Sequence, residues 1–150
     1  MKSIVLTIVL ALSSILSFGQ KINYNLENGY IADGYDVVAS FSDQTIAGKV
    51  TYSASYNGAR YKFINKENLA KFKSKPSEYV PQYGGWCAYA MGTKGKKVRI
   101  DAETFEIRDG KLYLFYNSWG NNKLESWLKE NPTSLKKEAA TNWKKIKHKQ

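Results

Sequence analysis

The sequence is poor in the side chains that most often bind metals or act as nucleophile and base. It contains one cysteine, Cys87, and one histidine, His148, which stands almost at the C-terminus. A single cysteine cannot form an internal disulfide, and no histidine close to it in sequence offers a general base. The chain also lacks a CxxC pair, a Ser-His-Asp set and a glycine-rich phosphate loop. We therefore expect a protein that is not an enzyme, with a thiol-dependent activity of Cys87 as the remaining enzymatic alternative.

Long apolar runs are absent except at the N-terminus. Lys2 precedes an apolar run from Ile4 to Leu16, and the small residues of Ser17-Phe18-Gly19 follow it. This order is typical of a secretory signal peptide and predicts cleavage before Gln20. The run is shorter than the about 20 apolar residues that a membrane span needs. We expect residues 1–19 to be removed, and the mature chain to be periplasmic or secreted, without a transmembrane segment.

Acidic residues are scarce relative to basic ones. Lysine and arginine together number 23 against 13 aspartates and glutamates, so the formal net charge is +10, or +9 once Lys2 is removed. Residues 136–149 alone contain six lysines and a single acidic residue, Glu138. Such a stretch is usually a solvated helix face, and its functional alternative is contact with an anionic envelope component, a polymer or lipid head groups. No nucleic-acid-reading module is recognisable, so we expect no specific nucleic-acid partner.

Turn and capping residues divide the mature chain, which has the length of one domain, into hairpins and helices. Asn57-Gly58 and Asp109-Gly110 are dipeptides favoured in two-residue hairpin turns. They predict one hairpin of strands 50–56 and 59–64 and another of strands 105–108 and 111–116. Helices are expected over residues 37–41, from Asn65 to before Pro76, from Cys87, from Asn117 to Leu128, and from Ser134 to about Lys147. The sequence therefore predicts an α+β fold: a small antiparallel sheet of β-hairpins, with helices packed on one side and C-terminal helices.

The two expected hairpins resemble each other at a constant offset. A glycine, a tyrosine, a phenylalanine and an asparagine recur after 52 residues: Gly58, Tyr61, Phe63 and Asn65 correspond to Gly110, Tyr113, Phe115 and Asn117. This pattern has two interpretations. It indicates either a duplicated unit of strand, turn, strand and helix, or two independent aromatic strands that each end in a capping residue.

The only cysteine stands in the most distinctive segment, Tyr83-Gly84-Gly85-Trp86-Cys87-Ala88-Tyr89. The two glycines allow a sharp turn or a close approach, and the residues after them favour a helix that starts at Cys87. A cysteine in the first helical turn is favoured as the thiolate, which is the form that binds metals. Met91 lies one helical turn further on, so that its thioether and the thiolate would suit Cu(I). The alternative is that Cys87 and Met91 are buried apolar residues among aromatic side chains.

These residues, together with others in a fixed order, resemble the YHS-domain family of small exported bacterial proteins. The specific part is Tyr83-Gly84-Gly85-Trp86-Cys87-Ala88, and the supporting motifs are Gly34-Tyr35-Asp36-Val37-Val38, Tyr56-Asn57-Gly58, Tyr61-Lys62-Phe63, Glu67-Asn68, Phe72, Pro76, Tyr79 and Asp109-Gly110-Lys111-Leu112-Tyr113-Leu114. The chain departs from the family at Val37, where many members have proline, and at Ser40, where an aromatic residue is common. The resemblance covers residues 31 to about 143. It implies a single YHS-like domain over residues 31–147, which includes the basic C-terminal helix, after an N-terminal extension over residues 20–30.

The family is thought of as metal-associated, and its cysteine, here Cys87, is usually proposed as the ligand. The resemblance therefore implies copper or another soft metal ion as cofactor, with Asp36 and Tyr89 as further neighbours. One thiolate is too few ligands for a tight metal site, because structural zinc sites generally have four protein ligands and blue copper sites add two histidines to the cysteine.

Two hypotheses remain open at this point. The first is a metal- or small-ligand-binding module, with Cys87 and Met91 as metal ligands and with cofactor-binding residues Tyr83, Gly84, Gly85, Trp86, Tyr89 and Asp36. The second is a non-catalytic envelope interaction protein, in which the cysteine is structural and the basic C-terminal helix makes the contact.

Overall fold

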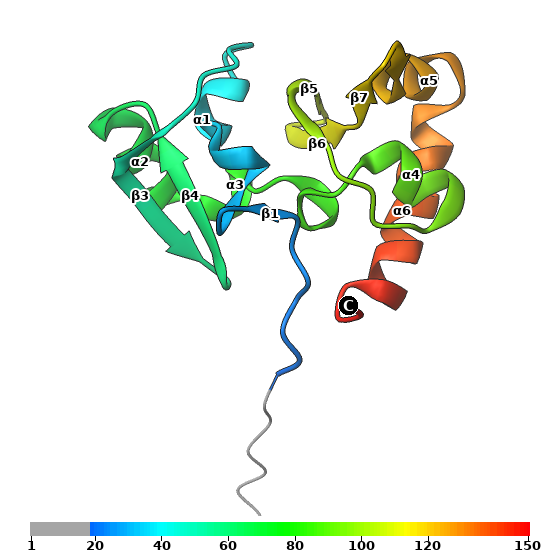
Figure 1. Cartoon of the computed structure of the whole chain (residues 1–150), viewed down its shortest axis with the longest axis horizontal. Coiled ribbons are helices and arrows are strands. Elements are labelled where there is room, and N and C mark those ends of the chain that lie inside the picture. Colours follow the sequence, from blue (N-terminus) through cyan, green and yellow to red (C-terminus); the bar gives the residue numbers. More distant parts are fainter. Residues whose placement is uncertain (1–18) are drawn as a thin grey trace, which may run out of the picture.

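The computed structural model describes residues 19–150, so the expected signal peptide lies outside the described residues except for Gly19. The chain forms two halves that lie side by side, each with its own hairpin and helices (Figure 1). Helices and small sheets both occur in each half, which confirms the α+β class. None of the described helices is long and apolar enough to cross a membrane.

The first half is built on a four-stranded sheet with the strand order β1-β2-β4-β3. Its pairs are antiparallel, except that β2 runs parallel to β4. The elements of this half are β1 (Leu26–Glu27), β2 (Tyr30–Ile31), the 3₁₀ turn η2 (Ala32–Gly34), α1 (Val37–Ser40), β3 (Lys49–Tyr56), β4 (Ala59–Phe63), α2 (Lys66–Ser74) and α3 (Pro76–Tyr79).

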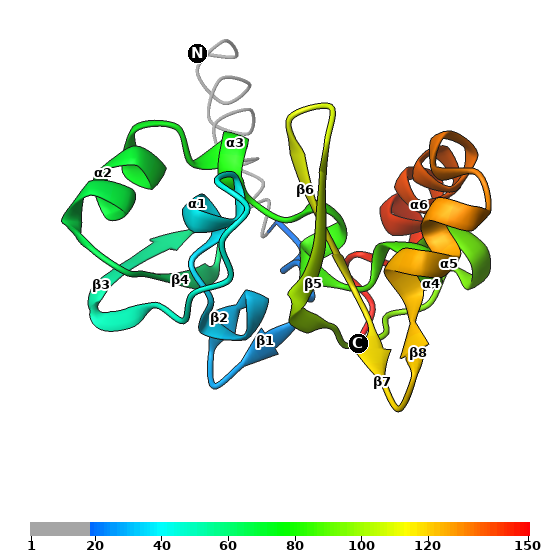
Figure 2. The same ribbon diagram turned by 90° about the horizontal axis from the view of Figure 1, so that it is seen from above.

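The second half contains two separate two-stranded sheets, β5-β6 and β7-β8. Its long C-terminal helix α6 packs against α4 at the outer end of the molecule (Figure 2). The elements of this half are the 3₁₀ turn η3 (Gln82–Gly85), α4 (Ala88–Lys94), β5 (Asp101–Arg108), β6 (Lys111–Phe115), β7 (Asn117–Ser118), β8 (Asn121–Asn122), α5 (Lys123–Lys129) and α6 (Pro132–Ile146).

The structure differs from the sequence prediction in three respects. The two hairpins lie in separate sheets instead of one, because each return strand buries its aromatic side chains in its own core. Residues 20–30 are more than an extension, because β1 and Tyr30 are part of the first sheet. The helix expected from Asn117 begins instead after Asn122, whose side chain accepts hydrogen bonds from the backbone N–H groups of Leu124 and Glu125. The short hairpin β7-β8 occupies the residues between these two asparagines.

The two long hairpins have the same strand register. Lys49 pairs with Phe63 and Tyr56 with Ala59 in the first, and Asp101 pairs with Phe115 and Arg108 with Lys111 in the second, all at an offset of 52 residues. Both ladders are interrupted at the same point, between positions 49 and 53 and between positions 101 and 105. Two independent aromatic strands would not need to share an interruption at the same position. The shared register and interruption therefore support the interpretation that the hairpins belong to a duplicated unit.

The aromatic side chains of the repeated strands are used in the same way. The ring of Phe72 on α2 lies 4.5 Å from that of Tyr61 and 5.0 Å from that of Phe63, measured between centroids. Trp127 on α5 lies 5.7 Å from Tyr113 and 5.4 Å from Phe115. Each half therefore has a core in which one aromatic residue of a helix covers two aromatic residues of the strand.

The buried tyrosines predict a loss of stability at high pH. Burial raises the pKa of the Tyr61 and Tyr83 phenols above their ordinary value of 10.0. In the unfolded chain these phenols ionise as the pH passes about 10, whereas in the folded protein they stay neutral. Unfolding then releases protons, so the free energy of unfolding is undiminished below about pH 10 and decreases above it.

Urea unfolding curves measured at a series of pH values from about 8 to about 11.5 would check this prediction. Tyr61→Phe is the informative variant, because it should reduce the decrease between about pH 10 and about pH 11.5. Equal slopes for the wild type and the variant would contradict a raised pKa of Tyr61.

Candidate functional site

The Tyr-Gly-Gly turn of η3 connects the two halves and has a left-handed backbone. The φ angles of Tyr83, Gly84 and Gly85 are 56°, 63° and 80°. This conformation is unfavourable for Tyr83, which has a Cβ atom, and the second core compensates for it. The Tyr83 ring is buried 6.0 Å from that of Tyr113, and its hydroxyl donates a hydrogen bond to the Lys136 carbonyl at 3.1 Å.

The two glycines permit close contacts from both ends of the chain. A Cβ atom on Gly84 would lie 2.6 Å from the indole ring of Trp143, and one on Gly85 would lie 3.0 Å from the side chain of Ile31. Asn25 joins the same turn, because its backbone N–H donates to the Gly84 carbonyl at 2.9 Å and its side-chain amide donates to the Gly85 carbonyl at 3.0 Å. The turn therefore holds the N-terminal segment and α6 together.

Cys87 lies at the start of α4, as the sequence predicts, and its side chain is fully buried. Its Sγ atom accepts a hydrogen bond from the Tyr116 N–H at 3.3 Å, and its own N–H donates to the Val98 carbonyl at 2.9 Å. Cys87 lies at the wall of a cavity of about 270 Å³ whose lining includes Tyr89, Lys94 and Lys123.

Asp36 occupies the corresponding position in the first half. It also follows a left-handed turn and caps a helix, and its N–H donates to the Ile46 carbonyl, 52 residues before Val98. Its carboxylate is buried and accepts four hydrogen bonds, from the N–H groups of Val38 (2.8 Å), Ala39 (3.1 Å) and Ile64 (2.9 Å) and from the Asn68 amide (2.8 Å).

The comparison of these two caps indicates a structural role for both. Ile64 and Tyr116, which donate to Asp36 and Cys87 respectively, are also 52 residues apart. Each side chain therefore ties the start of a helix to the end of the repeated hairpin. Asp36, expected near the cofactor, lines neither the cavity beside Cys87 nor the cleft described below.

The expected metal ligands do not form a ligand set. Met91 is fully buried in the second core with Ala88 and Trp127, and it does not line the cavity beside Cys87. Among residues 19–150 there is no group of three or more histidine, cysteine, aspartate or glutamate side chains that could hold a metal ion. Because Cys87 contributes a lone thiol, the donors present do not fit a tight site for copper or zinc.

The aromatic residues expected to form a wall around Cys87 all belong to or pack against the second core, but their polar groups have different partners. The Tyr83 hydroxyl donates to the Lys136 carbonyl, and the Trp86 indole N–H donates to the Asn23 carbonyl at 2.9 Å. The Tyr89 hydroxyl donates to Glu130 at 2.6 Å, and this hydrogen bond raises the pKa of Tyr89. Only Tyr89 lines the cavity with Cys87.

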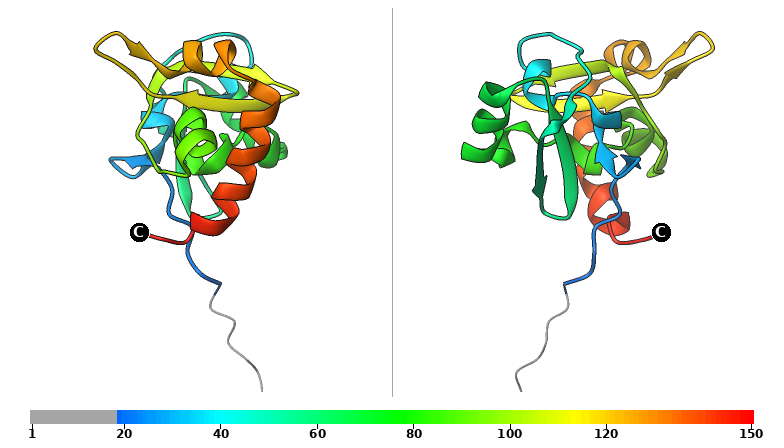
Figure 3. Two further views of the ribbon diagram at one scale, coloured as in Figure 1. Left: turned by 90° about the vertical axis from the view of Figure 1, so that its right-hand side faces the viewer. Right: turned by 60° about the vertical axis from the view of Figure 1, so that its left-hand side comes forward.

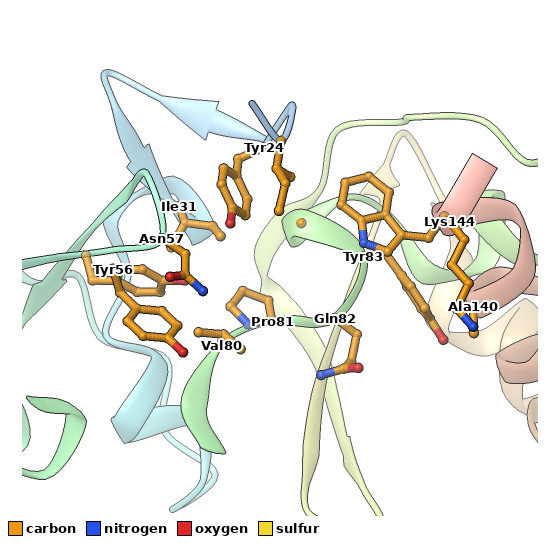
Figure 4. Close-up of a pocket in the computed structure, with 14 residues that line it drawn as sticks. Tyr24, Ile31, Tyr56, Asn57, Val80, Pro81, Gln82, Tyr83, Ala140 and Lys144 are labelled. Atoms are coloured by element: carbon orange, nitrogen blue, oxygen red, sulfur yellow. The ribbon is translucent and has the colours of Figure 1, made fainter. Parts of the chain in front are cut away.

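An aromatic cleft lies between the two halves, at the Tyr-Gly-Gly turn, and has a volume of about 320 Å³ (Figure 4). Tyr24 of the N-terminal segment, Tyr56 of the first half and Tyr83 of the second half face it (Figure 4), and Trp143 of α6 also lines it. Polar groups at the cleft are the side chains of Asn57, Gln82 and Lys144, and the other lining residues are Ile22, Ile31, Tyr61, Val80, Pro81, Gly84 and Ala140. No carboxylate is among the residues that line it.

Sequence reasoning found Tyr83 and Gly84 but missed the rest of this cleft. Tyr24 and Trp143 lie 119 residues apart in the chain, so only the folded structure brings them together. Trp143 packs against the second core but is only half-buried, so part of its ring is left to line the cleft. The sequence feature that could have indicated the cleft is Gly84, because a glycine beside a turn often allows another group to approach the backbone closely.

Comparisons with known proteins add no relative, because no family model, no curated protein and no solved structure matches the chain. The resemblance to the YHS-domain family therefore stays a prediction.

Replacement of Asp36 by alanine should destabilise the first half strongly. Four hydrogen-bond donors would lose their acceptor. Because some of them would stay buried without a partner, the free energy of unfolding should decrease by about 3 kcal/mol. Urea unfolding is the measurement, with Glu67→Gln as the control because Glu67 is an exposed acidic residue of α2. A loss no larger than that of the control would contradict the structural role.

The Cys87 thiol should react slowly with a chromogenic disulfide reagent in the native protein and rapidly in urea, because it is fully buried. Cys87→Ala should lower the free energy of unfolding by about 1 to 2 kcal/mol, since the Tyr116 N–H loses its partner. Cys87→Ser is the matched variant, because its hydroxyl keeps an acceptor. Stoichiometric native reaction at the rate of a free thiol would instead indicate a reactive site.

Proposed function

We propose that this protein is an exported YHS-like binding module that holds a small ring-shaped molecule in the aromatic cleft. The observation that carries the proposal is the convergence of five aromatic side chains from separate segments on one open hollow: Tyr24, Tyr56, Tyr61, Tyr83 and Trp143. Of these, Tyr24, Tyr56 and Trp143 are only half-buried, so their rings are not fully covered by the protein itself. Half-buried aromatic rings around a hollow are typical of ligand sites.

The polar groups of the cleft can fix the orientation of a bound ring, which stacking on aromatic rings alone does not. Aromatic rings bind flat rings with little preference for orientation, and each good ring pair contributes about 0.5 to 1.5 kcal/mol beyond the area that it buries. The amides of Asn57 and Gln82 each offer both a donor and an acceptor. These few polar groups would fix the orientation of a bound ring, as in other small-molecule sites. The cleft volume of about 320 Å³ suits a ligand of one or two rings.

The metal-binding hypothesis receives less support from the residues present. A small-ligand site and a metal site were both open from the sequence, and both included the Tyr-Gly-Gly-Trp-Cys segment. The described structure offers the ligand site several converging side chains but offers a metal a single buried thiol. We therefore prefer the small-ligand alternative, with copper retained only as a sequence-based prediction.

The proposal is tested by NMR on isotope-labelled protein of residues 20–150 with three probes: phenol, indole and N-acetylglucosamine oligomers. At least one probe should shift the indole N–H signal of Trp143 and the side-chain amide signals of Asn57 and Gln82. Trp143→Ala should weaken that binding about tenfold or more, because burial of a large ring against the probe is lost. Trp119→Ala is the matched control, because Trp119 does not line the cleft.

A second pair of variants tests the shape of the cleft. Gly84→Ala places a Cβ atom 2.6 Å from the Trp143 ring, whereas Gly110→Ala meets nothing within 4 Å, although both glycines have positive φ. Gly84→Ala should therefore cost about 1 to 3 kcal/mol more stability than Gly110→Ala and should also abolish probe binding. The absence of any cleft shift with all three probes, or unchanged binding in Trp143→Ala, would refute the proposal.

A further inference from the structure

The tip of the β7-β8 hairpin carries a tryptophan in a position where tryptophan is unfavourable. Trp119 and Gly120 form the turn, with φ angles of 52° and 72°, and the side chain of Trp119 is 100% exposed. Left-handed backbone is a strained conformation for a bulky residue, and an exposed ring has no contacts in the protein to offset that strain.

The other two-residue turns with a left-handed backbone begin with residues that tolerate this conformation. Asn28-Gly29, Asn57-Gly58 and Asp109-Gly110 all have positive φ at both residues. Asparagine and aspartate tolerate this conformation, and they are the usual first residues of such turns. Trp119 takes the place of asparagine or aspartate in the fourth turn. Neither the folding of the hairpin nor the packing of the core explains a tryptophan at this position, which points to an external contact.

Basic side chains lie beside this hairpin. Asn121 of the hairpin, Lys94 and Lys123 line one cavity, and Lys96 follows Lys94 in the loop after α4. The hairpin tip, this loop and the C-terminus lie on one side of the molecule (left panel of Figure 3). The C-terminal Lys149 is next to Lys96, since both line another hollow. Within residues 19–150, none of these four lysines takes part in an ion pair.

We propose that Trp119 and the lysines around it dock the protein on an anionic lipid surface. Tryptophan is favoured at the boundary between lipid head groups and acyl chains, where its ring is buried and its N–H stays hydrated. Lysines close to an anionic membrane add attraction, which the net charge of the mature chain, +9, reinforces.

A lipid surface fits this region better than a protein partner. Protein interfaces have a contiguous apolar centre, whereas Trp119 is a single projecting ring. The other exposed large apolar side chains among the described residues are Ile46, Val50, Ile107 and Leu128, none of which belongs to the hairpin. The proposal is independent of the cleft, because the two surfaces share no residue.

The test measures partitioning of residues 20–150 into phosphatidylcholine vesicles with and without phosphatidylglycerol. This chain is used because the apolar run of residues 4–16 would itself enter lipid, and because both described cores lie within residues 24–146. Circular dichroism should show that it is folded. We expect binding to the anionic vesicles only, a shift of tryptophan emission to shorter wavelength, and quenching by lipids with brominated acyl chains.

Variants separate the two contributions. Trp119→Ala should weaken partitioning about tenfold, because a large apolar ring is no longer buried. Lys94→Gln and Lys96→Gln should each weaken it about fivefold, and added salt should do the same. Val50→Ala is the matched control, since Val50 is 65% exposed but lies in β3 of the first half, and it should bind like the wild type.

Two results would overturn the proposal: no binding to anionic vesicles, or equal binding by Trp119→Ala and the wild type. If the protein that fails to bind vesicles is retained on an acidic polysaccharide, the partner is a polymer instead of a lipid surface. None of them would affect the cleft, whose probes are tested in the absence of lipid. Conversely, a cleft that binds no probe would leave the vesicle result unchanged.

Discussion

The left-handed turn at residues 83–85 is the constraint on which the arrangement of the two halves depends. Without side chains at Gly84 and Gly85, the backbone of this turn can touch Trp143 of the last helix and Ile31 of the first sheet. Asn25 binds the N-terminal segment to the turn through two hydrogen bonds to carbonyls of Gly84 and Gly85. A side chain at either glycine would force these segments apart, and the cleft between them would lose its present shape.

The two halves show how one structural unit supports two different caps. In the first half the buried carboxylate of Asp36 receives four hydrogen bonds, one of them from Asn68 on the following helix. In the second half the thiol of Cys87 receives a single one, from the Tyr116 N–H. The helix after the second hairpin begins later, because β7-β8 is inserted before it. A cavity remains beside Cys87. The cysteine is therefore best understood as the second copy of a structural anchor.

Both proposed binding surfaces include side chains that lie outside the repeated cores. The hairpin β7-β8 has no counterpart in the first half, where Asn65 caps the helix directly after the strand. It is this additional hairpin that presents Trp119 to solvent. The aromatic cleft likewise belongs to neither core alone, because its rings come from both halves and from the N-terminal segment. The hairpin thus lies outside both cores, whereas the cleft combines two core rings, Tyr61 and Tyr83, with the half-buried rings of Tyr24, Tyr56 and Trp143.

The sequence by itself determined the local elements, and the tertiary structure decided how they are combined. Asn57-Gly58 and Asp109-Gly110 suffice to predict the hairpins, and Asp36, Asn65 and Cys87 mark helix starts, because turns and caps depend on adjacent residues only. Asn117 misled the prediction because a capping residue is equally compatible with a short strand. The separation into two sheets and the meeting of Tyr24 with Trp143 depend on contacts between distant segments, which no local pattern encodes. The candidate site therefore lies beside Gly84 instead of Cys87. The sequence shows the glycine, but only the folded structure shows which side chains approach it.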